Sequence, residues 1–489
     1  MRKIAFAALL VVVACRGEQA RAPVVHNPRV IFVGLDGADW QLLDRLVADG
    51  TMPNLGALAR DGARGPLLTQ HPPLSPLVWT TMMTGVPPLR HRILDFTRYN
   101  PATRQREPIT SDERAVPAIW NMASSAGRRV DVVGLWATYP PERVNGTIVS
   151  DREIVRQGGG SGAERIRIET ELRHRTAMQL IENDHPDLAI VYFDGTDAMG
   201  HLLAPNVPRD YFARIDAIVG DYRKLAEKTG ATLVIASDHG FDWDGAPLPA
   251  PEPEPEPEPE SIVGNPEPEP KVGKAGLGLG RGLGNGGPAD AHRDEGIYLQ
   301  WPRRANALPH SVIDICPTLL DLLGMPRDVD AYRRSYHRAQ TAAPTPAASE
   351  QIAQLRALGY IGGNEPLSSA SSSSTRTAGS WSNEGLILRG EGRADDAIAA
   401  FENALRVDPN HAATKWNLSR SLLLRGKDAL KRSDCAAALK DFARAAELAP
   451  SDALAFASRG TAQLCLGDER AAKASFRRSL DIDPNQPLH

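Results

Sequence analysis

Three short apolar runs, each followed by an acidic residue, constrain the fold of this chain more than any other feature. They are residues 30–35 with Asp36, residues 188–193 with Asp197, and residues 232–236 with Asp238. From Arg29 to Arg334 such β-branched runs alternate with stretches of helical character, which predicts an α/β domain with a largely parallel sheet. Because open parallel sheets bind ligands beyond the carboxyl ends of their strands, we expect the three aspartates to meet at one edge of the sheet.

Three histidines join these aspartates as candidate metal ligands. They are His201, four residues after Asp197, His239, directly after Asp238, and His292, later in the chain. The four-residue spacing places two of the ligands on one face of a helical turn. Three aspartates and three histidines are what two zinc-class ions need if each takes three protein groups and keeps one position open. Two such ions are enough for a hydrolytic centre.

Ser75 is the candidate nucleophile for this centre. A serine hydroxyl is a weak nucleophile at its ordinary pKa, but coordination to a metal ion makes it an alkoxide without a nearby general base. Thr80 and Thr81 are alternative nucleophiles, and Ser75 could instead only cap a short helix that follows it. Asp194 is similarly an alternative to Asp197 as a ligand, although it lacks the four-residue spacing to the histidine.

The overall charge argues against a nucleic-acid-binding protein. The 489 residues include 56 Lys+Arg and 60 Asp+Glu, for a net charge of −4. Nucleic-acid-binding proteins carry a basic surface, so we expect no nucleic-acid binding. A chain of this length is also expected to form more than one domain.

The first fifteen residues have the form of a secretion signal. A basic head precedes an apolar run from Ile4 to Ala14, and Cys15 follows. The ending resembles the bacterial lipobox, which implies cleavage before Cys15, a lipid on its sulfur, and an exported protein tethered to a membrane in the cell envelope, at a periplasmic or extracytoplasmic face. The cysteines that remain are an odd and scattered set, which argues against a disulfide framework.

Two segments of low complexity interrupt the chain. Residues 246–290 contain a Pro-Glu repeat and a Gly/Leu tract, and we expect them to form an insertion in a surface loop. Residues 336–379 are rich in Ala, Ser, Thr and Pro, with one short helical segment over residues 349–358, and we expect a linker.

The C-terminal part of the chain repeats. Pro409, Pro450 and Pro484 recur at intervals of 41 and 34 residues, and alanine and phenylalanine precede each proline by twelve and eight residues. This pattern resembles the tetratricopeptide repeat over residues 380–487, which implies stacked helix pairs that bind a protein or peptide partner. The additional residues 427–433 predict a longer turn in the second repeat.

The segments around the candidate ligands resemble the alkaline phosphatase superfamily, and within it the type I phosphodiesterase/nucleotide pyrophosphatase family. These segments are residues 34–37, 52–55, 84–85, 197–201, 237–241 and 292–297. The resemblance covers residues 28–335 and implies an alkaline-phosphatase-like α/β catalytic domain, with a mostly parallel sheet flanked by helices, ahead of the all-α repeat domain. It further implies hydrolysis of a phosphate-ester substrate with two divalent metal ions, with zinc expected and manganese as the alternative.

By position, the resemblance also assigns a role to each candidate residue. Ser75 would carry a phosphoseryl intermediate, Asp36, Asp238 and His239 would bind the metal ion beside it, and Asp197, His201 and His292 would bind the other. Phe96, however, stands where nucleotide pyrophosphatases have a phosphate-binding asparagine. Either another group binds the phosphoryl oxygen, or the substrate differs.

A different class of function is compatible with the same residues. The α/β domain could bind a phosphorylated ligand without turnover while the repeats act as a scaffold for protein partners. Specificity in this superfamily lies in loops, so a nucleotide, a lipid head group and a cell-wall polymer are all compatible with the motifs.

Overall fold

A computed structural model describes residues 29–100, 105–157, 159–243, 291–304, 308–336, 346–361 and 376–485. The strands of the central sheet are β1 (Val30–Leu35), β2 (Ala63–Leu68), β5 (Val130–Val133), β6 (Gly146–Val149), β7 (Leu188–Phe193), β8 (Thr232–Ala236) and β11 (Glu295–Trp301). They form one seven-stranded sheet in the order β2-β11-β8-β1-β7-β5-β6. The five strands from β8 to β6 run parallel, and β11 pairs antiparallel with β8 and β2. The predicted fold class, an α/β domain with a mostly parallel sheet, is confirmed.

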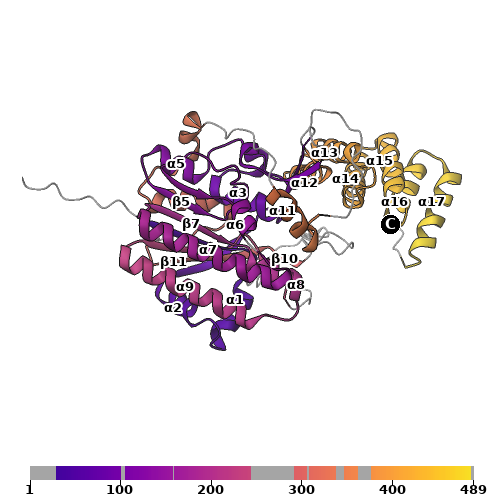
Figure 1. The fold of residues 1–489 in the computed structure, drawn as a ribbon. Coiled ribbons are helices and arrows are strands. Elements are labelled where there is room, and N and C mark those ends of the chain that lie inside the picture. The colour runs from indigo at the N-terminus through magenta and orange to yellow at the C-terminus, as the bar shows by residue number, and fades with distance from the viewer. Residues whose placement is uncertain are drawn as a thin grey trace, which may run out of the picture.

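Helices cover both faces of this sheet (Figure 1). One layer contains α1 (Trp40–Ala48), α2 (Pro53–Asp61), α7 (Gly162–Asp184) and α9 (Arg209–Thr229). The other contains α3 (Ser75–Thr84), α5 (Ile119–Ser125) and α10 (Ile315–Leu322). Shorter helices are α4 (Pro88–His91), α6 (Asp151–Gln157) and α8 (Gly195–Leu203), with 3-10 turns at Ser111–Glu113, Val312–Asp314 and Val329–Ser335.

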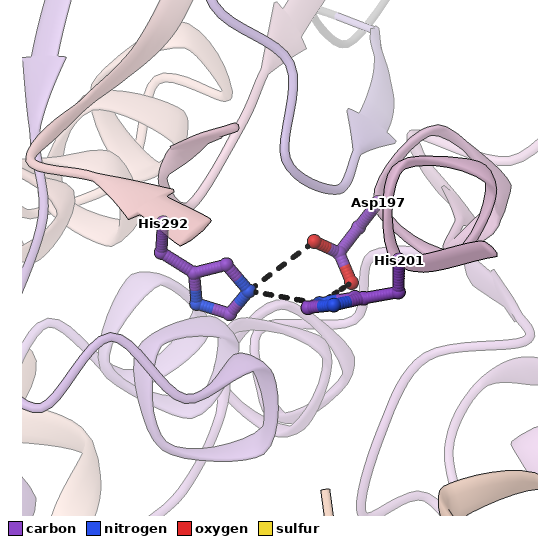
Figure 2. A group of neighbouring side chains, drawn as sticks. All are labelled: Asp197, His201 and His292. Carbon is purple, nitrogen blue, oxygen red and sulfur yellow. Dashed lines mark hydrogen bonds and ion pairs between the residues drawn. The ribbon is translucent and has the colours of Figure 1, made fainter. Parts of the chain in front are cut away.

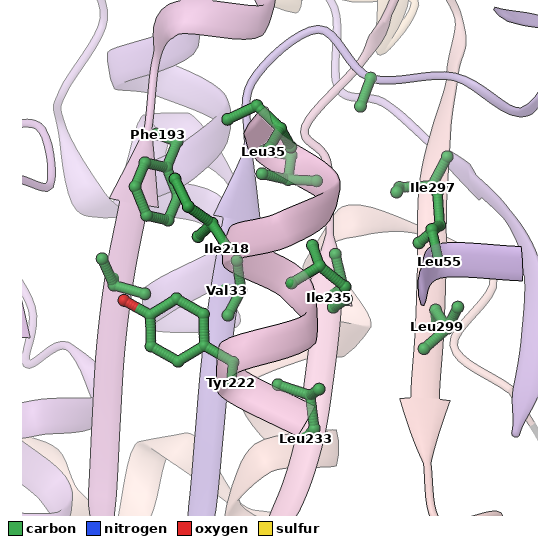
Figure 3. Close-up of a cluster of buried hydrophobic side chains, with 14 of the residues drawn as sticks. Val33, Leu35, Leu55, Phe193, Ile218, Tyr222, Leu233, Ile235, Ile297 and Leu299 are labelled. Atoms are coloured by element: carbon green, nitrogen blue, oxygen red, sulfur yellow. The ribbon is translucent and has the colours of Figure 1, made fainter. Parts of the chain in front are cut away.

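The three central strands β1, β7 and β8 are almost entirely apolar because both of their faces are buried. Side chains of a strand alternate between the two faces of a sheet. In β1, Val33 and Leu35 pack with α2 and α9 in the core shown in Figure 3, whereas Val30 and Phe32 pack with α3 and α5 on the opposite face. This double burial fixes the strand ends that carry the candidate site.

Two short antiparallel pairs lie outside the main sheet. β3 (Thr97–Asn100) pairs with β4 (Gln105–Pro108), and β9 (Gly240–Phe241) pairs with β10 (His292–Arg293). The second pair joins residues on the two sides of the 246–290 segment, which itself lies outside the described residues.

Helices alone make up the described C-terminal part. After α11 (Pro346–Ala357) come three hairpins, α12 (Ala378–Gly390) with α13 (Ala394–Val407), α14 (Ala412–Lys431) with α15 (Cys435–Leu448), and α16 (Ala453–Cys465) with α17 (Glu469–Ile482). Figure 1 shows them stacked beside the α/β domain. The predicted tetratricopeptide architecture is confirmed.

Two sequence-based expectations for the repeats were wrong. Residues 427–431 extend helix α14 and not the turn, because they are mostly strong helix formers, and Ser433 adopts the left-handed φ of 62° in the short turn that remains. In addition, Cys435 and Cys465 form a disulfide. Cys435 begins α15 and Cys465 ends α16, so the packing of these adjacent helices brings them together although 30 residues separate them.

Across the residues that the structure describes, no helix combines the length and the apolar character needed to cross a membrane. The predicted signal segment with Cys15 lies outside those residues.

Candidate metal centre

The three aspartates meet because their strands are neighbours in the sheet. β8, β1 and β7 are adjacent and parallel, with Gly34 paired to Ala236 and Leu35 paired to Phe193. Their carboxyl ends therefore lie at one edge, and the residues that follow them project into one site.

Asp36, Asp238 and His239 form the first group of candidate ligands. His239 Nε2 lies 3.3 Å from Asp36 Oδ1 and 3.3 Å from Asp238 Oδ2, and all three residues are buried. One ligand atom from each residue lies within 4.8 Å of the others. This is the set that the sequence assigns to the metal ion beside the nucleophile.

Asp197, His201 and His292 form the second group (Figure 2). His201 Nε2 lies 3.4 Å from Asp197 Oδ2 on the same face of α8, and His292 Nε2 lies 3.3 Å from Asp197 Oδ1. The β9–β10 pairing, in which His292 opposes Phe241, brings this histidine back to the sheet edge. The rings of His292 and His239 stack with centroids 3.9 Å apart, so the two groups are adjacent.

The donor atoms of both groups fit bound cations. Asp197 Oδ1, Asp238 Oδ2 and His239 Nε2 are buried and have no hydrogen-bond partner among the described residues. Buried polar atoms are nearly always paired, so these three atoms are available to a ligand that is itself positively charged.

Backbone carbonyls orient two of the imidazoles. His239 Nδ1 lies 3.0 Å from the carbonyl oxygen of Gly240, and His292 Nδ1 lies 2.9 Å from that of Pro73. Because a carbonyl only accepts hydrogen bonds, each Nδ1 carries the proton and each Nε2 directs its lone pair into the site.

Burial dominates the electrostatics of the first group. Burial, together with the charge of Asp197, raises the pKa of Asp36 to about 8, and burial with Asp36 raises the pKa of Asp238 well above its ordinary value. Burial lowers the pKa of His239 to about 3, so its imidazole is neutral at neutral pH. A bound cation would stabilise the ionised form of these two carboxylates.

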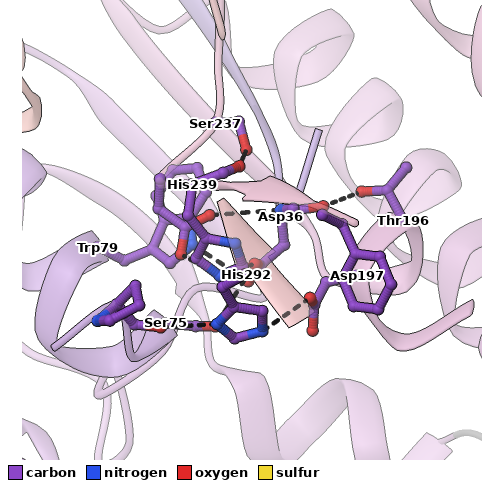
Figure 4. Close-up of polar contacts among 12 residues, drawn as sticks. Asp36, Ser75, Trp79, Thr196, Asp197, Ser237, His239 and His292 are labelled. Carbon is purple, nitrogen blue, oxygen red and sulfur yellow. Dashed lines mark hydrogen bonds and ion pairs between the residues drawn. The ribbon is translucent and has the colours of Figure 1, made fainter. Parts of the chain in front are cut away.

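Ser75 lies at this centre, as Figure 4 shows. It is the first residue of α3, it is buried, and its Oγ donates to Asp36 Oδ1 at 3.4 Å. It does not cap the helix, whose N-cap is Leu74. The hydroxyls of Thr80 and Thr81 instead donate to carbonyls one turn earlier in α3.

Asp194, the alternative ligand, lies outside both groups. Its Oδ2 accepts a hydrogen bond from Arg173 Nη2 at 2.7 Å, and the Arg173 side chain is buried. This ion pair fixes the turn between β7 and α8, which carries Asp197.

Two glycines of the sequence motifs leave room for the ligands. Gly37 has a φ of +65°, and a Cβ there would lie 2.8 Å from Asp197 Cβ. A Cβ on Gly200 would lie 2.6 Å from the ring of Phe241, which packs edge-on against His201. Both positions therefore require glycine for the two groups to approach each other.

Two tyrosines at the centre were missed by sequence reasoning. Tyr192 donates to Asp36 Oδ2 from the end of β7. Tyr360 follows α11, in the segment expected to be a linker, and its hydroxyl donates to Asp197 Oδ2 and lies 2.8 Å from His201 Nε2. The signal that could have identified Tyr360 was the helix predicted over residues 349–358 between two low-complexity tracts.

Known protein families match both parts of the chain. The family model described as type I phosphodiesterase/nucleotide pyrophosphatase matches residues 30–243, and the tetratricopeptide repeat model matches residues 383–428 and 423–487. A search of curated proteins found no significant match. The chain thus carries a type I phosphodiesterase/nucleotide pyrophosphatase domain, of the alkaline phosphatase superfamily, followed by tetratricopeptide repeats.

Solved structures are similar at low sequence identity. A phosphonoacetate hydrolase from Sinorhizobium meliloti 1021 with bound phosphonoformate is 21% identical, with 44% of this chain and 57% of that chain covered and a TM-score of 0.36. Human ectonucleotide pyrophosphatase/phosphodiesterase 5 is 16% identical, with 68% and 99% covered and a TM-score of 0.40. The first repeat domain of Spaghetti, bound to an HSP90 peptide, is 24% identical, with 22% and 82% covered and a TM-score of 0.18.

Proposed function

We propose that this protein is a metal-dependent phosphoric ester hydrolase that acts through a phosphoseryl intermediate on Ser75. The observation that carries this proposal is the placement of a buried serine hydroxyl against Asp36, within one of two adjacent groups of ligand-type side chains. Asp36, Asp238 and His239 hold the metal ion beside the nucleophile, and the second group holds the other. When bound, the ions supply Lewis acidity to the phosphoryl oxygens and lower the pKa of the serine hydroxyl.

The residues of the chain define the course of the reaction. Ser75 Oγ releases its proton to solvent and attacks phosphorus, and the bond from phosphorus to one alcohol oxygen breaks. That oxygen takes up a proton from solvent and leaves as the alcohol, and the phosphoryl group stays on Ser75 with its remaining substituent. Water then attacks the same phosphorus, which releases the product and restores the hydroxyl. The N-terminus of α3 directs its free backbone N–H groups toward the phosphoryl charge, although Pro76 contributes none.

The pocket beside Ser75 favours an ester with a neutral organic substituent. Among the described residues its walls are mostly apolar and include Phe96, Trp136, Leu202 and Leu355. The cation in the wall, Arg165, is already bound to Glu169, with Nε 2.8 Å from Oε1. A second phosphate group would find no uncommitted cation in this part of the pocket, so we propose a phosphodiester as the substrate.

Replacing the nucleophile tests the proposal. Zinc-loaded wild type is expected to hydrolyse bis-p-nitrophenyl phosphate and to lose this activity in chelator. Ser75→Ala is expected to lower kcat by at least about a thousand-fold. Thr80→Val is the matched control, because it removes a nearby hydroxyl that bonds only within its helix. Full activity of Ser75→Ala, or turnover that persists without metal, would sink the proposal.

We further propose that the protein is exported and anchored by a lipid on Cys15, on the strength of the signal-like N-terminal sequence. In cells fed an alkyne fatty acid, the wild type should become labelled and be recovered with the membranes, whereas Cys15→Ala should be unlabelled and absent from the membrane fraction.

We propose that the repeats bind a peptide or protein partner. The suggested contact is the groove lined by Leu405, Arg406, Lys415 and Arg444.

A further inference from the structure

Helix α11 lies outside the region matched by the family model, yet it forms one wall of the pocket beside Ser75. Gln351 Nε2 donates to Asp151 Oδ2 at 2.9 Å, and Gln354 Nε2 donates to Glu169 Oε1 at 2.7 Å. Apolar residues complete the contact, namely Ile352, Leu355, Ile361 and Phe96. Both polar and apolar contacts therefore fix α11 on the α/β domain.

This anchoring places Tyr360 directly over the second ligand group. Its ring packs against Phe96, with centroids 4.4 Å apart, and against His201, with centroids 4.9 Å apart. The hydroxyl donates to Asp197 Oδ2 and lies 2.8 Å from His201 Nε2. It lines the same pocket as Ser75.

The contacts of this hydroxyl are with atoms that are also candidate metal ligands. In the metal-loaded protein Asp197 Oδ1 and His201 Nε2 direct lone pairs at the cation, so Asp197 Oδ2 is the neighbouring atom that still accepts the phenolic hydrogen, and another acceptor can compete with it. An oxygen of a phosphoryl group bound beside Ser75 would be such an acceptor, because Ser75 and Tyr360 line the same pocket.

Other donors in the described pocket wall already have partners. Arg165 is bound to Glu169, and Trp136 Nε1 donates to Tyr192 at 2.7 Å. Tyr192 in turn donates to Asp36. Tyr192 and Tyr360 therefore both donate to candidate metal ligands, and Tyr360 is the one whose hydroxyl lies on the second ligand group.

We propose that Tyr360 is a further catalytic residue, whose hydroxyl donates a hydrogen bond to a non-bridging phosphoryl oxygen of the bound ester. The proposal rests on the proposed hydrolase function. It also assigns a role to α11, which carries this donor to the centre from beyond the matched domain.

Two measurements on the zinc-loaded full chain test this role in Tyr360→Phe, which keeps the ring and removes the hydroxyl. The first is the affinity for inorganic phosphate by calorimetry, and the second is kcat/KM for bis-p-nitrophenyl phosphate. Phosphate should bind about 10- to 100-fold more weakly, as expected when a hydrogen bond to a charged group is lost. The value of kcat/KM should fall about 100-fold or more, with zinc content and thermal midpoint unchanged. Tyr332→Phe, whose hydroxyl donates to the carbonyl of Pro326 away from the pocket, is the control.

Each contrary result has a distinct meaning. Unchanged phosphate affinity and kcat/KM in Tyr360→Phe overturn the donor role and leave the hydrolase function intact. Loss of bound zinc overturns it in favour of a tyrosine ligand. If the wild type binds phosphate but hydrolyses no ester, the proposed function fails, while weaker phosphate binding by Tyr360→Phe still supports the donor. A wild type that binds no phosphate overturns both.

Discussion

Among single residues, Asp36 links the metal centre most directly to pH. Burial raises its pKa to about 8, whereas an aspartate in the unfolded chain ionises near 3.8. From about pH 6.5 to 8 the folded metal-free protein therefore keeps a proton that the unfolded chain has lost. This proton makes the free energy of unfolding fall as pH rises through the window, by up to about 1.4 kcal/mol per pH unit, and Asp238, whose pKa is also raised, adds to the fall. The pKa of His201 is also raised, because the attraction of Asp197 outweighs the opposing effect of burial. His201 therefore lowers the free energy of unfolding in the same direction as pH rises.

Urea unfolding in the presence of a chelator, at several pH values in this window, measures the effect. Asp36→Asn should make the dependence shallower, because the amide does not titrate and its loss of charge also removes one cause of the raised pKa of Asp238. Zinc-loaded protein should also show a shallower dependence, since the bound ion keeps the carboxylate ionised in the folded state. A stability of the metal-free wild type that is constant or rises with pH would contradict the assignment of a raised pKa to Asp36.

At the scale of elements, the short β9–β10 pair determines whether the second ligand group is complete. Arg293 beside His292 has Nη2 2.9 Å from Asp242 Oδ1 and Nη1 3.8 Å from Asp39 Oδ2. It therefore ties β10 to the residue after β9 and to the N-cap of α1. We predict that Arg293→Ala lowers zinc affinity at the second group by about 10- to 100-fold and spares the first group.

Zinc titration against a competing chelator checks this prediction. Two tight sites in the wild type should become one tight and one weak site in Arg293→Ala. Arg327→Ala removes an exposed ion pair with Asp321 and should leave both sites unchanged. Two unaltered sites in Arg293→Ala would show that His292 is held without this contact.

The same elements show how far the sequence alone could predict the site. The six candidate ligands were proposed from residue type, short spacings and the ends of apolar runs, and Ser75 from its place before a short helix, all of which is local information. Tyr360 was missed because its position depends on α11 packing against Phe96, more than 250 residues earlier in the chain. The Cys435–Cys465 pair was missed for the same reason, since only the packing of α15 against α16 brings its ends together.

At the scale of the whole molecule, the first repeat helix is docked on the α/β domain next to the pocket. Thr377 Oγ1 donates to Asp95 Oδ2, and Asn383 Nδ2 donates to the carbonyl of Leu94 at 2.7 Å. Ile387 of α12 is buried in the core that also contains α3 and α10. Leu94 and Asp95 directly precede Phe96, on which Tyr360 packs. These contacts therefore connect the repeats with a segment that lines the pocket.

This docking predicts energetic coupling between the two parts of the chain. Asp95 and Thr377 are both buried, so their hydrogen bond should contribute about 1–3 kcal/mol to the free energy of unfolding. In a double-mutant cycle, Asp95→Asn and Thr377→Val should each destabilise the protein, and the double variant should be less destabilised than the sum of the two. Denaturant unfolding, followed by fluorescence and by circular dichroism, measures all four proteins. Strictly additive effects would mean that the repeats are held on the catalytic domain by Asn383 and Ile387 alone, and the coupling through Asp95 would have to be abandoned.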